Sequence, residues 1–182
     1  RGEAGDVDDV IYLSGEVGVG GGVLVDGRPL TGVAGFGGEV GHVALDPDGL
    51  PCRCGSTGCW ETLVGEQALL RLAGRPDESG RRAVDAVLAD AAAGVPSALA
   101  AVAEVGRWLG VGLAGLVNVF NPRLVVLGGL FGRVHPFVRA TVDGELDRRA
   151  LAGSRALVRV APAGLGVDAP LLGAAELALE PL

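Results

Sequence analysis

Three cysteines and one histidine lie close together in the first third of the sequence. The cysteines are Cys52, Cys54 and Cys59, and His42 stands ten residues before the first of them. Three thiolates and one imidazole form the complete four-ligand shell that Zn²⁺ takes in tetrahedral structural sites. Glycines between the cysteines allow the backbone to turn tightly enough for the thiolates to converge. The spacing therefore predicts a structural zinc ion held by these four residues.

Two alternatives remain open for the cysteines: one disulfide bond with a spare thiol, or three reduced thiols in an ordinary loop. An odd number of cysteines in a chain of cytosolic character argues against a disulfide framework. Residues 31–60 lack periodicity and are rich in Gly, Pro and Cys, which is unusual for a connection of this length. A bound metal would explain how such a loop stays ordered, and zinc is therefore favoured.

Two carboxylates flank the expected metal ligands. Glu39 lies three residues before His42, and Glu61 lies two residues after Cys59. A zinc-bound imidazole keeps its second nitrogen protonated, as a hydrogen-bond donor of fixed orientation. Two carboxylates beside one such N–H group match the vicinal hydroxyls of a sugar, because each carboxylate accepts from two hydroxyls. The spacing predicts a sugar site formed by Glu39, His42 and Glu61, although each glutamate taken alone is more simply a solvated carboxylate.

The elements that must position this site begin with a hairpin. Residues 10–13 form a short apolar run that is typical of a buried strand. Five glycines within 15–22 predict a turn directly after it. Asp26-Gly27 is a strong hairpin signal between short strands at 23–25 and 28–30. The first 30 residues are therefore expected to be strand, glycine turn, strand, tight turn and strand.

Helices and strands alternate in the rest of the chain. Helices are expected at 66–73, 81–93, 96–120, 136–151 and 170–179, and further strands at 123–127 and 157–161. The helix at 96–120 is the clearest, because its apolar residues recur at spacings of three and four and form a single stripe. This alternation predicts one α/β layered domain, undivided by a linker or repeat.

Composition excludes several classes of protein. With 22 acidic residues against 15 arginines the net charge is -7, so the segment by itself is a poor nucleic-acid binder. Gly reaches 32 of 182 residues, yet 49% of residues are hydrophobic and no short period repeats, which excludes collagen and argues against disorder. No uninterrupted apolar run approaches the roughly 18 residues of a membrane span, so a cytoplasmic protein is expected. The chain begins at Arg1 and has no Met, and we expect it to be part of a longer polypeptide.

The runs Gly38–His42 and Cys52–Glu61 together resemble the signature of the ROK family (repressors, open reading frames and sugar kinases). Similar segments recur at 18–22, 118–129 and 173–175. The resemblance covers nearly the whole chain, but only the C-terminal lobe of the family's two-lobed, actin-like, hexokinase-like (ribonuclease H-like) ATPase fold. It implies a single C-terminal lobe over residues 1–182 with a zinc loop at about 38–61. The N-terminal lobe and any helix-turn-helix domain would lie outside this chain.

The resemblance also implies roles for individual residues. The zinc ligands would be the same four residues, and the sugar contacts would be the same two glutamates and histidine. Five glycines are similar to those that face the phosphates and nucleoside of ATP in kinases of the family: Gly18, Gly20, Gly21, Gly128 and Gly129. Glycine suits these positions because phosphate must approach backbone N–H groups closely, and glycine has no side chain in the way.

The implied ligands and partners follow from the same resemblance. Zn²⁺ would be structural, and ATP with Mg²⁺ would bind only if the protein is a kinase. A small-molecule sugar or amino sugar would be the ligand, and the full protein would form a homodimer or higher homo-oligomer. DNA would be contacted only through a domain that is absent here, and no membrane partner is expected.

One segment bears on whether the protein is a kinase or a sensor. Kinases of the family usually have Gly-Thr-Gly-x-Gly-Gly-Gly where this chain has Glu16-Val17-Gly18-Val19-Gly20-Gly21-Gly22. Val17 cannot donate a hydrogen bond to phosphate, and Glu16 adds a negative charge where the phosphates would lie. The family's Asp-x-Gly-x-Thr motif and Asn-Asp pair, which belong to the N-terminal lobe, are also absent, so no catalytic residue is expected in this chain.

These departures favour the sugar-binding effector domain of a transcriptional regulator, a repressor, over the C-terminal lobe of an ATP-dependent, glucokinase-like sugar kinase. A lobe with a purely structural or interaction role is the third alternative.

Overall fold

The structure is a computed structural model that describes residues 4–165 of the chain. Within that range, five strands form one mixed sheet in the order β3-β2-β1-β4-β5. The strands are β1 (Val10–Gly15), β2 (Val19–Val25), β3 (Arg28–Pro29), β4 (Leu124–Gly128) and β5 (Arg159–Pro162). β1 pairs antiparallel with β2 and parallel with β4, and β4 pairs parallel with β5. The hairpin at the front thus continues into a parallel α/β half.

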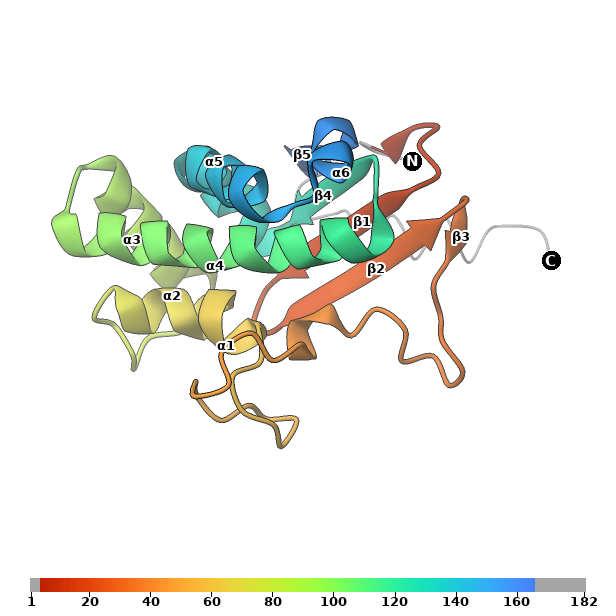
Figure 1. Cartoon of the computed structure of the whole chain (residues 1–182). Helices are drawn as coiled ribbons and strands as arrows, with labels where there is room; N and C mark the ends of the chain where they lie inside the picture. The colour runs from red at the N-terminus through yellow and green to blue at the C-terminus, as the bar shows by residue number, and fades with distance from the viewer. Residues whose placement is uncertain (1–3, 166–182) are drawn as a thin grey trace.

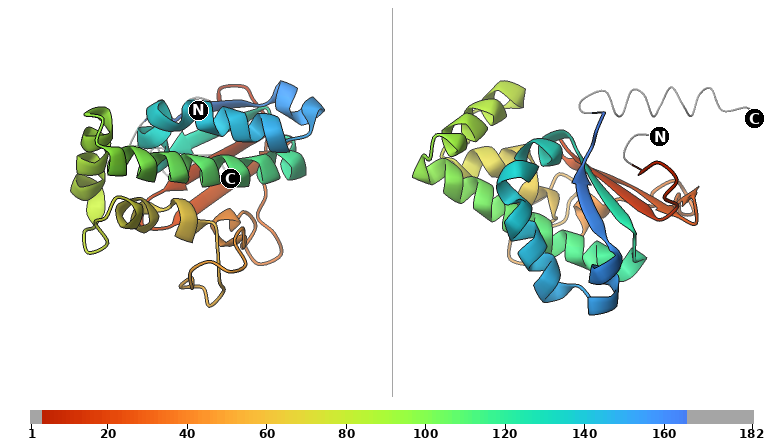
Figure 2. Two further views of the ribbon diagram at one scale, coloured as in Figure 1. Left: turned by 60° about the vertical axis from the view of Figure 1, so that its left-hand side comes forward. Right: turned by 90° about the horizontal axis from the view of Figure 1, so that it is seen from above.

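The helices of the described part lie largely on one side of this sheet (Figures 1 and 2). They are the short 3₁₀ turn η2 (Val40–His42) and α1 (Glu61–Val64), α2 (Glu66–Leu72), α3 (Gly80–Ala92), α4 (Pro96–Phe120), α5 (Gly129–Arg149) and α6 (Ala152–Leu157). α4 is the longest, and it runs across the sheet beside α5. The segment before α1 forms a loop that projects below α1 and α2 in Figure 1; we call residues 42–60 the cysteine loop.

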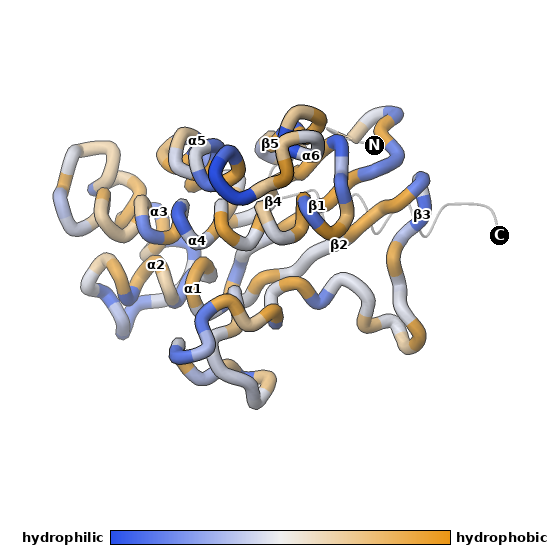
Figure 3. Tube along the Cα trace, in the orientation of Figure 1, coloured by the Kyte–Doolittle hydropathy of each residue, from blue (hydrophilic) through white to orange (hydrophobic). Residues whose placement is uncertain are grey.

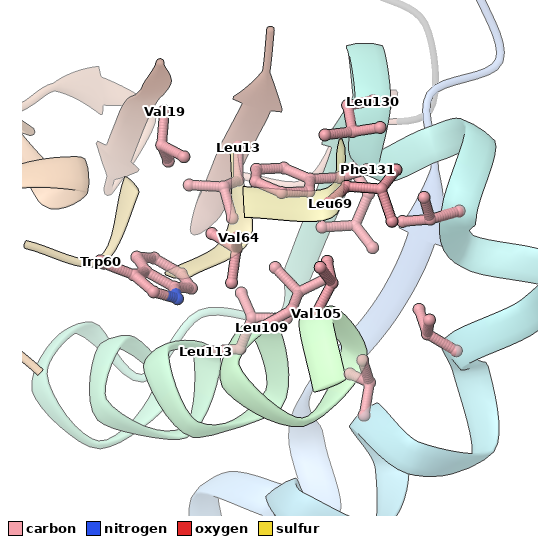
Figure 4. Packing of buried hydrophobic residues seen from close by; sticks show 14 of the residues in the cluster. Leu13, Val19, Trp60, Val64, Leu69, Val105, Leu109, Leu113, Leu130 and Phe131 are labelled. Carbon is pink, nitrogen blue, oxygen red and sulfur yellow. The ribbon is translucent and has the colours of Figure 1, made fainter. Parts of the chain in front are cut away.

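One face of the sheet and the helices share a single apolar core. Leu13 of β1 is fully buried in one cluster with Leu109 and Leu113 of α4 and Phe131 of α5 (Figure 4). Ile11 of β1 belongs to the same cluster and is also fully buried. The cysteine loop differs from this core, because hydrophilic and hydrophobic residues follow each other in short succession along it (Figure 3). The loop therefore cannot be held in place by burial of an apolar face alone.

Most of the expected elements are confirmed within a few residues, and the helices at 66–73, 81–93 and 96–120 correspond to α2, α3 and α4. The helix expected at 170–179 lies outside the described residues. The short helices α1 and α6 were not anticipated. Since α6 occupies 152–157, the last strand begins at Arg159 rather than at 157.

The structure corrects the expected extent of the glycine turn. The turn itself is confined to residues 16–18, and the glycines at 20–22 lie in strand β2. A Cβ atom on Gly21 would come within 2.6 Å of the Val40 side chain. Glycine is required at that position by close approach of a neighbouring segment and not by a turn, and the sequence does not distinguish the two causes.

The structure also corrects the expected start of the helix at 136–151, which is α5. The helix begins at Gly129, seven residues before the expected start, and Pro136 lies inside it. Gly129 has φ of +54°, so strand β4 passes into the helix through a single glycine in the left-handed region. Pro136 is the eighth residue of α5 and lies beyond the first turn, so it removes the helical hydrogen bond to the carbonyl of Gly132.

The structure also corrects the expectation that no segment has the length and composition of a membrane span, because α4 has both. It has 25 residues and a mean hydropathy of 1.4 over its most apolar window, so it is long and apolar enough to cross a membrane by length and composition. Its valines, leucines and alanines raise that average, although glycines and a few polar residues interrupt the apolar run. Because 61% of the window is buried in the structure, as in the core helix of a globular domain, this is weak evidence for a span.

Glycines let α4 and α5 approach closely, and one pair of substitutions tests this contact. A Cβ on Gly106 would lie 2.7 Å from Cβ of Val138, whereas a Cβ on Gly115 meets open space. Replacing Gly115 with alanine should stabilise the protein by about 0.5–1 kcal/mol through helix propensity. Gly106→Ala should instead destabilise it by about 1–3 kcal/mol through overpacking. Urea unfolding measures both, and equal effects of the two substitutions would contradict the assigned packing.

A buried carboxylate near this contact makes stability depend on pH. Glu145 of α5 is only 4% exposed and accepts hydrogen bonds from Arg149 Nε at 2.7 Å and Arg148 Nη2 at 2.5 Å. These two guanidinium groups hold the pKa of Glu145 below its ordinary value. A lowered pKa in the folded state contributes stability above the unfolded value of about 4.3. That contribution is lost as the pH falls through the folded pKa.

We therefore expect Glu145→Gln to lower the free energy of unfolding by about 1–2 kcal/mol at pH 7, in line with hydrogen bonds to charged groups. The difference from the wild type should shrink as the pH falls below the unfolded value of about 4.3 and through the lowered folded pKa, where the native carboxylate also becomes protonated. Urea unfolding at pH 7 and pH 3.5 measures this difference. Asp147→Asn, at an exposed carboxylate of the same helix, is the control and should stay within about 0.5 kcal/mol. A difference independent of pH would exclude the ion pairs as its source.

Candidate metal and sugar site

The structure brings the four expected metal ligands together. His42 ends the turn η2, Cys52 and Cys54 lie in the cysteine loop, and Cys59 lies two residues before α1. The ligand atoms of all four residues lie within 4.8 Å of one another. Cys52 Sγ is 3.7 Å from His42 Nδ1, and Cys54 Sγ is 3.5 Å from Cys59 Sγ. The group could therefore hold one metal ion.

The separations of 3.7 Å and 3.5 Å fit a tetrahedral ion. With metal–sulfur bonds of about 2.3 Å and metal–nitrogen bonds of about 2.0–2.1 Å, neighbouring ligand atoms of a tetrahedron lie about 3.5–3.8 Å apart. All three cysteines are free thiols, so the disulfide alternative is not adopted. Cys52 and Cys59 are buried, whereas His42 and Cys54 reach the surface. The donor set and the spacing both suit zinc.

The cysteine loop is folded back on itself by its own backbone. Cys52 N–H donates to the carbonyl of Ser56, and Gly55 N–H donates to the carbonyl of Cys52, which closes a tight turn around the first two thiols. Gly58 has φ of +67°, and a Cβ there would lie 1.5 Å from the carbonyl oxygen of Asp46. No other residue type fits at Gly58, because both its backbone conformation and its surroundings exclude a side chain.

Without a metal, the three thiols do not ionise alike. Hydrogen bonding from the backbone at Ser56 lowers the pKa of Cys54, whereas burial raises the pKa of Cys59. Backbone hydrogen bonding at Cys54 acts to lower the pKa of Cys52, but the carboxylate of Glu61 and burial outweigh it and raise that pKa to about 12. Cys52 and Cys59 therefore keep their protons at neutral pH when no metal is bound. A dication would displace these protons, as metals do when they bind thiolates.

The two expected sugar-contacting carboxylates lie on either side of the imidazole. Glu61 is the first residue of α1, and its Oε1 lies 3.0 Å from Cys52 Sγ and 3.9 Å from His42 Nδ1. Glu39 Oε2 lies 3.9 Å from His42 Nε2. The Glu61 side chain is 16% exposed and that of Glu39 is 59% exposed. Nδ1 therefore faces the thiols, and Nε2 faces outward toward the more exposed carboxylate.

The expected phosphate-loop glycines do not form one cluster. Gly18 lies against the carboxylate of Glu61, because a Cβ there would be 2.8 Å from Glu61 Oε2. Gly128 and Gly129 lie at the end of β4 and the start of α5, where a Cβ on Gly129 would be 2.5 Å from Glu16 Oε1. Gly20 and Gly21 lie within β2, and Gly21 packs on Val40. Gly18 thus borders the site, Gly129 borders the Glu16 side chain, and Gly128 lies against the Tyr12 hydroxyl.

A cavity of about 180 Å³ beside Glu61 includes residues that we did not anticipate. Its lining consists of Val17, Leu50, Pro51, Cys52, Arg53, Glu61, Thr62, Gln67, Ala68 and Arg71. Gln67 and Arg71 stand four residues apart on α2 and so share one helix face. The four-residue spacing of Gln67 and Arg71 was the only feature of the sequence that could have pointed to this lining. It became informative once the structure had placed α2 and the cysteine loop around the same cavity.

Comparison with known proteins identifies the class to which this fold and site belong. The sequence model of the ROK family matches residues 1–181. The xylose repressor of Bacillus subtilis (strain 168) is 32% identical over 179 residues, which cover 98% of this chain and 46% of the repressor. The glucokinase of Streptomyces coelicolor is 33% identical over 190 residues, which cover 95% of this chain and 60% of the glucokinase.

Solved structures agree with this result. A ROK family glucokinase from Streptomyces griseus, in complex with glucose and AMPPNP, matches with a TM-score of 0.82 and 31% identity over 94% of this chain and 61% of that one. The mixed α/β sheet and its helices are thus those of ROK kinases and regulators, and the actin-like assignment fits. The chain belongs to the ROK family. It spans about half the length of the curated relatives that it matches.

Proposed function

We propose that residues 1–182 form the C-terminal lobe of a ROK-family transcriptional regulator, a repressor, and that this lobe binds a sugar beside a structural zinc ion. The observation that carries the proposal is the pair of carboxylates around His42, whose Nδ1 faces the thiols and whose Nε2 faces Glu39. The N-terminal lobe and a helix-turn-helix domain would complete the protein. The net charge of -7 is compatible with DNA contact through that other part.

The zinc ion would be held by His42, Cys52, Cys54 and Cys59. Four protein ligands close the coordination shell, so the ion supplies structural stability and leaves no open position for a substrate. The chain's own residues then define the sugar site. Ligation through Nδ1 leaves the Nε2–H of His42 as a hydrogen-bond donor of fixed direction. The carboxylates of Glu39 and Glu61 beside the ring are acceptors.

Sugar recognition would use this alternation of donors and acceptors. Glu61 lies in a partly buried position, where a charge-assisted hydrogen bond to a hydroxyl is strengthened by the exclusion of water. Glu39 is more exposed, and its contribution should be smaller. The complex of the Streptomyces griseus relative with glucose supports a sugar as the ligand. An amino sugar fits the same donors and acceptors.

The surroundings of the glycine loops favour a sensor over a kinase. Val17 at the turn is 59% exposed and cannot donate a hydrogen bond to a phosphate. The carboxylate of Glu16 lies beside Gly129, at the N-terminus of α5, where the helix dipole would otherwise attract an anion. A phosphate there would meet a negative charge. The sugar-site carboxylates are unaffected by these changes, which is what sensing without phosphorylation requires.

A glucokinase-like kinase is the second candidate, and its specific support is the 33% identity to the Streptomyces coelicolor glucokinase. The deciding experiment uses the full-length protein, with a coupled assay for sugar-dependent ATP turnover and calorimetry for sugar binding. We expect sugar binding without turnover above background. Sustained turnover would show that the protein is a kinase and not a regulator. An absence of binding to any neutral sugar or amino sugar would overturn both proposed functions. In either case the protein is expected to be a homodimer or higher homo-oligomer, which light scattering measures.

A further inference from the structure

Trp60 is the residue between a metal ligand and a sugar-site carboxylate, since Cys59 precedes it and Glu61 follows it. Its side chain is 1% exposed and is the largest of the fully buried side chains in the described part of the chain. Figure 4 shows the indole pointing from the start of α1 toward α4, near Val64 and Leu113. The position of Trp60 therefore affects both neighbours at once, because one peptide unit separates it from each.

The indole makes a specific polar contact with α4. Trp60 Nε1–H donates to the backbone carbonyl of Trp108 at 3.0 Å. In an α-helix that carbonyl also accepts from the N–H four residues later, which belongs to Gly112. A carbonyl has two lone pairs and can accept both bonds. The contact thus joins the cysteine loop to α4 without breaking the helix.

Gly112 leaves the space that the ring needs. A Cβ there would lie 2.1 Å from Cε2 and 2.3 Å from Cζ2 of Trp60. Glycine in a helix interior costs about 1 kcal/mol relative to alanine, so a reason is expected for it at a buried position. The indole of Trp60 supplies that reason, whereas Gly115, one turn further along, meets open space.

The backbone of Trp60 ties the two sides of the site together. Its N–H donates to the carbonyl of Val43, the residue after His42, at 2.8 Å. Its own carbonyl accepts from the N–H groups of Leu63 and Val64 in α1. Trp60 is therefore bonded to the segment of His42, to the helix that begins at Glu61, and to α4.

The turn of α4 that receives Trp60 is itself held in place. The Trp108 ring lies under the guanidinium of Arg107, 4.3 Å from the ring centroid, and its Nε1 donates to Glu104 at 2.9 Å. Arg107 also donates two hydrogen bonds to Glu104. On its other side α4 packs closely on α5 through Gly106 and Gly110. α4 therefore provides a fixed reference against which the site is set.

We propose that Trp60 is the positioning residue of the site: its indole, seated on Gly112 and bonded to the Trp108 carbonyl, sets Cys59 and Glu61 relative to α4. The part of this inference that concerns sugar affinity rests on the proposed function of Glu61. The part that concerns metal geometry does not, because Cys59 belongs to the four-ligand cluster whether or not a sugar binds. Trp60 acts through its neighbours and is not itself a ligand.

The test compares Trp60→Phe and Gly112→Ala in the full-length protein, with Gly106→Ala as the matched control. Trp60→Phe keeps a buried ring and removes the indole N–H, and Gly112→Ala displaces the indole. Gly106→Ala strains the same helix against Val138 of α5 without contacting Trp60. The measurements are the metal content, the absorption spectrum of the protein loaded with Co²⁺, and the affinity for D-glucose, D-xylose and N-acetyl-D-glucosamine, all taken below the melting temperature.

We expect both site variants to keep one metal ion per chain but to change the shape of the cobalt–thiolate absorption, which Gly106→Ala leaves unchanged. The affinity for the sugar that the wild type prefers should fall by about tenfold in both, as for one weakened hydrogen bond to a charged group. Equal spectra and affinities in all four proteins would overturn the inference. The same spectral change in Gly106→Ala would reduce Trp60 to a general structural role.

The two proposals fail in different ways. If the wild type binds no sugar, the proposed function is wrong, and the cobalt spectra still decide the role of Trp60. If the wild type binds a sugar and the variants match it in every measurement, the positioning role is wrong and the proposed function stands. If Gly112→Ala does not fold, Trp60→Phe carries the test alone, since it leaves the helix sequence intact.

Discussion

Replacing Cys59 with serine should abolish stoichiometric metal binding and unfold the cysteine loop. Cys59 is fully buried, and its Sγ faces Cys54 Sγ at 3.5 Å. A neutral hydroxyl cannot replace a thiolate as a zinc ligand, so affinity should fall by more than the about 10–100-fold that loss of an outer hydrogen-bond partner costs. The binding free energy of a structural metal is also folding free energy. A loss of about 3 kcal/mol would lower the melting temperature by about 6–12 °C.

Elemental analysis and thermal unfolding, each with and without a chelator, measure these effects. The chelator should bring the wild type down to the melting temperature of Cys59→Ser and leave that variant unchanged. Thr57→Ala is the matched control, because Thr57 lies in the same loop with an exposed side chain outside the ligand set. Full metal content in Cys59→Ser, or an unchanged melting temperature in the chelator, would remove the structural metal from the proposal.

Replacing Glu61 with glutamine should abolish most sugar affinity and leave the metal in place. Glutamine has the shape of glutamate, but it offers one neutral acceptor where the carboxylate offers two charged oxygens. Hydrogen bonds to charged groups contribute about 1.5–3 kcal/mol, which corresponds to a loss of affinity of about 10–150-fold. The metal should stay because Glu61 is outside the ligand cluster, although its Oε1 lies 3.0 Å from Cys52 Sγ.

Calorimetry with the sugar that the wild type binds, together with metal analysis of the same samples, checks this expectation. Glu78→Gln, at an exposed carboxylate of the loop before α3, is the control and should bind as the wild type does. Unchanged affinity in Glu61→Gln would make Glu61 an ordinary helix N-terminal acid. Loss of both sugar and metal would mean that its main role is to support the cysteine loop.

Much of the candidate site could be predicted because its candidate metal ligands and carboxylates lie close together in the sequence. Three thiols within eight residues and an imidazole ten residues earlier have few joint uses other than a metal, and the structure places their ligand atoms together. The two carboxylates followed from the same argument, since each lies within three residues of a ligand. The helix α4 was equally clear, because a 25-residue amphipathic stripe has one stable orientation toward a core.

The glycines show where prediction from the sequence fails. A glycine that allows a left-handed turn, as at Gly129, and one that allows close approach, as at Gly21, are identical residues with different physical causes. The start of α5 was misplaced because Pro136 resembles a helix start, although the helix had already begun at Gly129. Local pattern cannot separate these cases, since the deciding contact comes from another segment.

The sequence by itself determined which groups could bind a metal and a sugar, because coordination and hydrogen bonding depend on residue type and short spacing. Only the tertiary structure decided what holds those groups in position. Trp60 is paired with Trp108, 48 residues away, and the space for its ring is a missing Cβ at Gly112. Packing between distant segments leaves no periodic signal in either one, so the support of the site appears only once the chain is folded.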